Sequence, residues 1–139
     1  MREILFRGKT FDNEWIYGFL ILDRAEHNQP RIDYLGEYST GTFYCCQAPR
    51  VHRSSVGQFT TLTDKNGKKI FEGDIVKTDK FNTLNKLYVI KYDLLLGAFI
   101  GEDDGTMCFT TFDGDSDHFE VIGNIYDNPE LLKEQQNER

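Results

Sequence analysis

The chain of 139 residues is long enough for one compact domain, or for two small units that share a core. Its net charge of −7 argues against general binding to nucleic acid. Its longest apolar run, Trp15 to Leu22, falls well short of the roughly 18 residues that a membrane-spanning helix needs. Eleven Phe and seven Tyr favour a sheet with a well-filled core. We therefore expect a soluble, cytoplasmic, mainly β protein with no membrane partner.

The first predicted strands contain the candidate interaction surface. After a short strand over residues 2–7, the run "EWIYGFLIL" over residues 14–22 is apolar on both of its faces. Such a strand is either central in a sheet or covered on its second face by a partner chain. Core packing is the simpler interpretation, and self-association is the alternative. The candidate interface residues are Trp15, Tyr17 and Phe19 on one face, and Ile16 and Leu20 on the other.

Two short strands are predicted next, over residues 31–35 and 42–46, after a polar loop at 23–30. The second of them contains two of the three cysteines, Cys45 and Cys46, and Cys108 follows much later. An odd, small set with two adjacent members is not typical of a disulfide framework. We interpret all three as reduced thiols in the core.

The segment "TDKNGKKIFEGDIVK", residues 63–77, contains two carboxylates near two tight turns. Asn66-Gly67 favours a type I′ hairpin, in which both central residues have positive φ. We expect Asp64 to accept hydrogen bonds from turn amides, and Asp74 to cap a second turn in which Gly73 has positive φ. The alternative is that Asp64 and Asp74 form a catalytic acid pair.

Further strands are predicted over residues 86–92, 94–100, 106–112 and 118–125. Asn128-Pro129-Glu130 then has the pattern of an N-cap, a first-turn proline and a first-turn acid, which predicts a short helix. Short strands at this spacing, separated by Gly- and Asp-rich turns, indicate a small antiparallel barrel or roll.

Three parts of the chain resemble the YopX family, whose members are small proteins encoded by phages and prophages of Gram-positive bacteria. The opening resembles the family at Arg7, Trp15 and Gly18, and residues 120–132 resemble its closing segment. Thr61 stands where the family pattern has Gly. The central match is Gly57-Gln58-Phe59-Thr60, Asp64-Lys65-Asn66-Gly67, and Ile70 with Glu72-Gly73-Asp74-Ile75-Val76.

The resemblance implies a mainly β protein whose "EGDIV" half is a compact SH3-like barrel, and it implies no established activity. We therefore expect two parts: extra N-terminal strands over residues 1–60, which mediate oligomerisation, and the barrel with its C-terminal helix over residues 61–139.

Local patterns that carry chemistry are weak in this sequence. Asp113, Asp115 and Asp117 have calcium-loop spacing, but His118 and Asn124 replace the Gly and Glu that such a loop requires. An acidic turn between strands is the simpler interpretation. The histidines and cysteines have no metal-type spacing. We expect no catalytic residues, no metal site and no cofactor.

Charge is unevenly distributed along the chain. Residues 64–92 hold seven basic and four acidic residues, net +3, whereas residues 93–139 hold two basic and twelve acidic residues, net −10. Solvated charge is the simpler interpretation, and contact between the basic segment of one copy and the acidic segment of another is the alternative.

These observations favour a non-enzymatic binding or adaptor module that acts as a homo-oligomer in the host cytoplasm. Its expected partners are a second copy and a host or phage protein, and not nucleic acid. Two other functions stay open: a small hydrolase that uses carboxylates of the last third, and an acidic decoy for nucleic-acid-binding proteins. The decoy would need the carboxylates of residues 102–104, 113–117 and 120 on one surface.

Overall fold

The fold is known from a computed structural model, which describes residues 1–34, 48–79, 86–103, 106–110 and 116–137, without the side chains of 106–110, 116 and 135–137. The chain divides into two compact units, Met1–Phe59 and Thr60–Arg139. The helix is α1 (Glu130–Asn137). The strands are β1 (Phe6–Lys9), β2 (Trp15–Asp23), β3 (Gln29–Asp33), β4 (Gly57–Thr63), β5 (Lys69–Phe71), β6 (Asp74–Thr78), β7 (Leu87–Asp93), β8 (Ala98–Asp103), β9 (Thr106–Thr110) and β10 (Phe119–Asn124).

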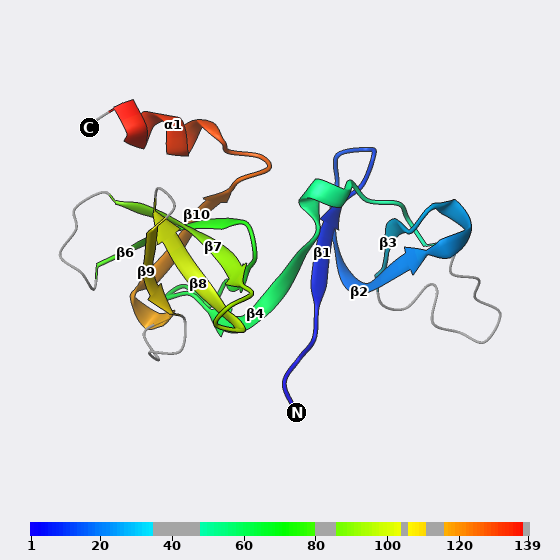
Figure 1. The fold of residues 1–139 in the computed structure, drawn as a ribbon, viewed down its shortest axis with the longest axis horizontal. Helices are drawn as coiled ribbons and strands as arrows, with labels where there is room; N and C mark the ends of the chain where they lie inside the picture. The colour runs from blue at the N-terminus through cyan, green and yellow to red at the C-terminus, as the bar shows by residue number, and fades with distance from the viewer. Residues whose placement is uncertain (35–47, 80–85, 104–105, 111–115, 138–139) are drawn as a thin grey trace. The chain divides into compact units, whose positions relative to one another are not determined.

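The mainly β class with a short C-terminal helix is confirmed (Figure 1). The strands form two antiparallel sheets with the orders β3-β2-β1-β4-β5 and β10-β6-β7-β8-β9. Within the described residues both sheets are open, so the expected closed barrel is not observed. No described helix is long and apolar enough to cross a membrane.

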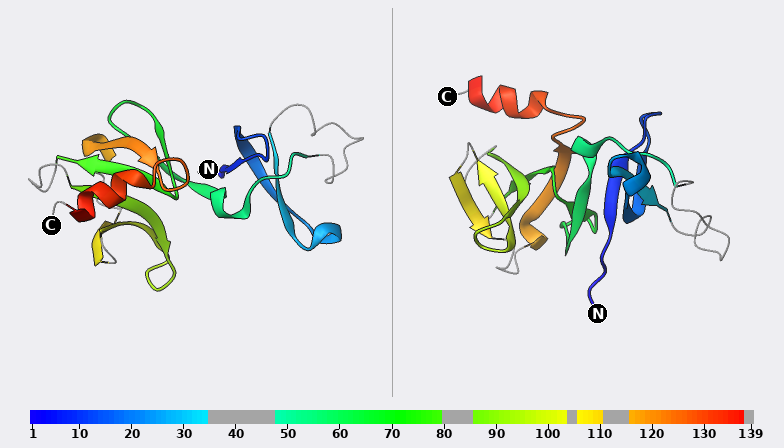
Figure 2. Two further views of the ribbon diagram at one scale, coloured as in Figure 1. Left: turned by 90° about the horizontal axis from the view of Figure 1, so that it is seen from above. Right: turned by 45° about the vertical axis from the view of Figure 1, so that its right-hand side comes forward.

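The first unit is built around β2, which pairs with β1 on one side and β3 on the other (Figure 2). The segment that follows residue 47 forms hydrogen bonds with both β1 and β3. Pro49 accepts a hydrogen bond from the amide of Ile32, and the amide of His52 donates to the carbonyl of Lys9. The core of this unit lies under these hydrogen bonds, at Ile32, Ala48 and Val51, which are fully buried.

The second unit has its core between β5, β6, β7 and β10. Its buried cluster consists of Ile70, Val76, Tyr88, Ile90 and Phe119, with Leu62 and Val121 packed against it. Their strand neighbours Phe71, Ile75 and Val89 are buried as well, so β5, β6 and β7 bury side chains on both of their faces. After β10, the Oδ1 atom of Asn128 accepts a hydrogen bond from the amide of Asn124 at 3.2 Å, which fixes the connection to α1.

The β4–β5 hairpin differs from the predicted type I′ turn. Gly67 has φ = 80°, but Asn66 is not among the residues with positive φ. The amide of Gly67 donates to the carbonyl of Asp64, so residues 64–67 form a four-residue turn and Gly67 follows its two central residues in the left-handed region. This is the pattern of a three-residue loop with a glycine bulge. The side chain of Asp64 selects it by accepting hydrogen bonds from the amides of Asn66 and Lys68, both at 2.9 Å.

The predicted strand over residues 94–100 is wrong in its first half. Leu94, Leu95 and Leu96 lie in the β7–β8 turn, and β8 begins at Ala98. The Oδ1 atom of Asp93 accepts hydrogen bonds from the amides of Leu95 and Leu96, and Gly97 has φ = 63°. Local turn chemistry therefore outweighs the preference of three apolar residues for a strand.

Thr61 lies within β4 at φ = 74°, a conformation that a β-branched residue rarely adopts. Its neighbours Phe59 and Thr60 are both buried, which breaks the alternation of the strand at this point. Thr61 is also the position at which the YopX pattern has Gly. A backbone that requires the left-handed region explains that preference physically, because glycine adopts it without steric cost.

We predict that Thr61→Gly stabilises the protein by about 1 kcal/mol. Relief of the strained φ is worth about 1–3 kcal/mol, and the extra freedom of glycine in the unfolded chain cancels part of it. Urea unfolding followed by circular dichroism measures the change. Thr63→Gly is the matched control, because Thr63 is exposed on the same strand without positive φ. It should destabilise by about 0.5–1 kcal/mol, and equal effects of the two changes would contradict the prediction.

We also predict that the stability of the second unit depends on the charge of Asp64. Burial alone would raise the pKa of this carboxyl, but hydrogen bonds from the amides of Val121, Lys68 and Asn66 lower it below its ordinary value of 3.8. A lowered pKa in the folded state gives stability that is complete above the unfolded pKa and is lost as the pH falls through the folded one. Asp64→Asn should therefore cost about 1–3 kcal/mol at pH 7, because an amide group then faces backbone donors.

The measurement is urea unfolding of both proteins from pH 7 down to pH 2. The difference in stability between wild type and Asp64→Asn should shrink below about pH 3.8. Asp117→Asn, at an exposed site in the same unit, controls for loss of a charge. A difference that stays the same at pH 7 and pH 2 would show that the carboxylate charge does not carry the effect.

Candidate functional site

The best candidate site is an exposed aromatic surface on β2. Trp15, Tyr17 and Phe19 alternate along the strand and therefore share one side of the sheet, which we call the aromatic face. Tyr17 and Phe19 keep 46% and 52% of their surface exposed, and Trp15 is partly buried. A pair of half-exposed aromatic rings on one strand is a typical feature of binding surfaces.

The opposite side of β2 is partly buried from Ile16 to Leu20, whereas Leu22 at its end is 51% exposed. Leu20 lies across from Ile32 and Ile16 lies across from Gly8, where an added Cβ would come within 2.9 Å of Val51. At Gly18 an added Cβ would lie 2.0 Å from the carbonyl oxygen of Asp33, so this position accepts glycine alone. Ile16 and Leu20, which the sequence proposed as interface residues, are therefore partly buried on the core side.

Cations from β1 support the aromatic face. Arg7 lies across from Tyr17 and Lys9 across from Trp15, on the same side of the sheet. The guanidinium carbon of Arg7 is 4.8 Å from the centroid of the Trp15 ring, and the ammonium of Lys9 is 5.6 Å from it. These cation–π contacts hold the indole against β1. The contact of Arg7 with Trp15 gives a physical reason for both residues in the opening part of the YopX pattern.

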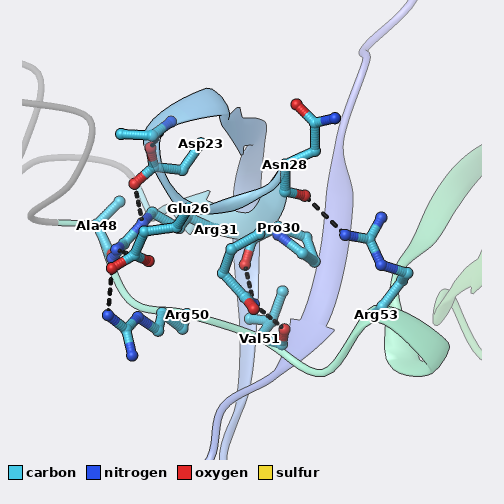
Figure 3. A network of polar contacts seen from close by, with 11 residues as sticks. Asp23, Glu26, Asn28, Pro30, Arg31, Ala48, Arg50, Val51 and Arg53 are labelled. Atoms are coloured by element: carbon cyan, nitrogen blue, oxygen red, sulfur yellow. Dashed lines mark hydrogen bonds and ion pairs between the residues drawn. The ribbon is translucent and has the colours of Figure 1, made fainter.

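A polar network that sequence patterns missed lies at the far end of β2 (Figure 3). Arg31 is buried and contacts three partners: Asp23 at 2.9 Å, the carbonyl of Ala48 at 2.7 Å and Glu26 at 2.6 Å. Arg50 also pairs with Glu26. The guanidinium of Arg31 therefore ties the β2–β3 turn to the segment at residue 48.

This network has a structural role, because its groups are engaged with one another. Buried charges are stable where they are paired and hydrogen-bonded, as Arg31 and Asp23 are. Asp23 begins the predicted loop over residues 23–30 and Arg31 follows it, so the sequence already places these two opposite charges near each other. Arg50 is 24 residues from Glu26, and no local pattern indicates their contact.

Asp64 and Asp74 are engaged with backbone amides. Asp64 is buried, and its Oδ2 atom accepts from the amide of Val121 at 3.0 Å while Oδ1 accepts from the turn. Asp74 is also buried, and its Oδ2 atom accepts from the amide of Phe71 at 2.8 Å. Gly73 beside it has φ = 86°. A general acid near neutral pH needs a raised pKa, whereas the amide hydrogen bonds lower the pKa of Asp64.

The basic and acidic segments meet within one chain. Glu120 lies between Lys65 and Lys77 at 3.4 and 3.2 Å, and hydrogen bonds from these lysines lower the pKa of its carboxyl. Two further pairs, Lys86 with Asp103 and Lys91 with Glu102, join the same segments. Contact between the basic segment of one copy and the acidic segment of another was the alternative interpretation. These four ion pairs instead form within the second unit.

Two of the three cysteines and most of the acidic loop with calcium-like spacing lie outside the described residues. Cys45, Cys46, Asp113 and Asp115 are not described, and of Cys108 the backbone alone is described. Among the described residues, no group of three or more His, Cys, Asp or Glu side chains is arranged to hold a metal ion. His118 contacts Asp79 at 2.7 Å on the surface.

Comparison with known proteins identifies the family. No curated protein matches this chain. Among solved structures, the crystal structure of protein EF1440 from Enterococcus faecalis is similar, with 27% sequence identity and a TM-score of 0.59. The match covers 95% of this chain and 99% of that one. The model of the YopX protein family matches residues 5–133, which include the aromatic face, Asp64 and Asp74, and the chain therefore belongs to the YopX family.

Proposed function

We propose that this protein is a non-enzymatic binding or adaptor module that self-associates through the aromatic face. The observation that carries the proposal is the exposure of Tyr17 and Phe19, two aromatic side chains that lie on the same face of β2. The setting we propose is the cytoplasm of a Gram-positive host, with the protein encoded by a phage or prophage. The family resemblance supports that setting.

Binding is favoured over catalysis because several carboxylates of the second unit are already hydrogen-bonded or paired with lysines. The carboxylates of Asp64 and Asp74 accept backbone hydrogen bonds, and Glu102, Asp103 and Glu120 pair with lysines. A hydrolase would need at least one acid free to exchange a proton with a substrate. A decoy for nucleic-acid-binding proteins would need unpaired carboxylates in a row, and three of its proposed carboxylates already have lysine partners. Binding through the aromatic face does not require free carboxylates.

We also propose that the second unit has an SH3-like architecture. The support is a five-stranded antiparallel sheet with order β10-β6-β7-β8-β9, preceded by the tight β4–β5 hairpin. In this view the first unit, with β1 to β3, supplies the surface for association, and the second unit is a compact β module attached to it through β4.

We predict that the protein sediments with a mass above that of the 16.2 kDa chain, in a concentration-dependent equilibrium. The single tryptophan lies on the aromatic face, so its emission should shift to shorter wavelength as association removes water from Trp15. Phe19→Ser should weaken association about tenfold or more, because it removes roughly 1.5 kcal/mol of apolar burial.

Phe11→Ser is the matched control, because Phe11 is exposed to the same degree but lies outside β2. It should leave the sedimentation equilibrium unchanged, and circular dichroism should show that both variants are folded. A wild-type protein that stays at the mass of one chain up to about 1 mM would refute the proposal.

A further inference from the structure

The β7–β8 turn presents three leucines to solvent. Leu94, Leu95 and Leu96, which we call the leucine finger, are exposed by 88%, 98% and 51%. Three consecutive leucines at a hairpin tip are unusual on the surface of a protein whose mean hydropathy is −0.53. Near the finger, Lys91 and Glu102 pair with each other, and the carboxylate of Asp93 binds amides of the turn itself.

The finger is held in one shape by its own turn. The side chain of Asp93 accepts hydrogen bonds from the amides of Leu95 and Leu96, at 2.8 and 2.9 Å. Its backbone carbonyl accepts one from the amide of Gly97, at 2.8 Å. Below the tip, Tyr92 and Phe99 lie opposite each other, with their rings edge to face at 5.2 Å. A preorganised apolar element loses little conformational entropy when it binds.

We propose that the leucine finger of one copy packs on the aromatic face of a second copy, and that the reverse contact forms across a two-fold axis. This inference rests on the proposed self-association and names the surface that covers the aromatic face. The finger is a convex apolar surface, and the aromatic face is a flat apolar surface on a strand. In a two-fold dimer such a contact occurs twice, because each copy supplies one finger and one face.

Buried area favours this arrangement over two simpler ones. At about 100 Å² for a leucine and about 200 Å² for an aromatic side chain, the finger with Tyr92 exposes roughly 300 Å² and the aromatic face roughly 200 Å². Two fingers packed together would bury roughly 600 Å² of apolar surface, and two aromatic faces roughly 400 Å². The reciprocal contact buries roughly 1,000 Å², which reaches the minimum for a specific interface.

A lipid surface is the other occupant that three exposed leucines suggest, and the charges disfavour it. Peripheral membrane elements combine apolar tips with clusters of Lys and Arg that contact anionic headgroups. Here Lys91 is paired with Glu102, and residues 93–139 carry a net charge of −10. A second copy requires no such cluster.

The test uses two full-length variants that each remove one half of the contact. Leu95→Asp disables the finger, and Phe19→Asp disables the face. Ser54→Asp, at an exposed site in the first unit, controls for the added charge. Sedimentation equilibrium should give twice 16.2 kDa for the wild type and for Ser54→Asp, and the mass of one chain for the other two at the same concentration. Circular dichroism checks that each variant is folded.

Mixing the two variants then distinguishes the arrangements. A heterodimer of Leu95→Asp with Phe19→Asp retains one intact finger and one intact face, which can meet each other. The mixture should therefore associate at least tenfold more tightly than either variant alone, and less tightly than the wild type. Two variants that remain monomeric when mixed would overturn the reciprocal contact.

The remaining outcomes separate this inference from the proposed function. If Leu95→Asp dimerises like the wild type and Phe19→Asp does not, the aromatic faces pair with each other, and this inference alone fails. If the wild type is a monomer, the inference and the proposed function both fail. Binding of the wild type, but not of Leu95→Asp, to phosphatidylcholine vesicles without dimerisation would assign the finger to a lipid surface instead.

Discussion

A small unit cannot bury every apolar side chain, and in the described part of the first unit the exposed ones include Tyr17 and Phe19 of β2. A unit of about 60 residues buries only about 60% of the surface of its unfolded chain. Ile32 lies beside Leu20 on one face of the sheet, and Val51 lies close to Gly8 of β1. Tyr17 and Phe19 on the other face of β2 are about half exposed. In the proposed function, β2 stabilises the fold with one face and binds with the other.

The polar groups of the molecule mostly hold backbone in place. Asp64 joins the β4–β5 turn to β10, and Arg31 joins the β2–β3 turn to residue 48. Each of these side chains forms hydrogen bonds with backbone groups near a turn, where strand pairing does not supply them. A buried charge is costly unless its hydrogen-bonding capacity is used, so such residues are constrained by folding before any chemistry is considered. This accounts for a sequence that is rich in Asp and has no recognisable catalytic pattern.

The sequence predicts local structure well where a residue type has a single conformational role. It predicts poorly where side-chain hydrogen bonds or tertiary contacts compete with the local preference. The positive φ at Gly73 and the close approach at Gly18 follow from glycine itself. Asn66-Gly67 favours a type I′ turn by itself, but the structure has a different turn. The carboxylate of Asp64 accepts three hydrogen bonds from backbone amides, and these decide the backbone conformation. The leucines of residues 94–96 have the pattern of a strand but form a turn, because periodicity alone does not distinguish an apolar strand from an apolar turn. The contact of Arg50 with Glu26 depends on the tertiary fold and has no local signal.

Exposed apolar surface on a small protein must be reconciled with solubility. The leucine finger and the aromatic face would each promote nonspecific aggregation if nothing opposed it. A net charge of −7 opposes it, because copies repel each other at long range while a close apolar contact is little affected by screened charge. The lysines of the second unit neutralise several of its acids locally, so the excess charge is carried by other residues of the last third. If copies associate as proposed, this repulsion favours contacts that bury both apolar surfaces at once, because a partial contact gains too little free energy to overcome it.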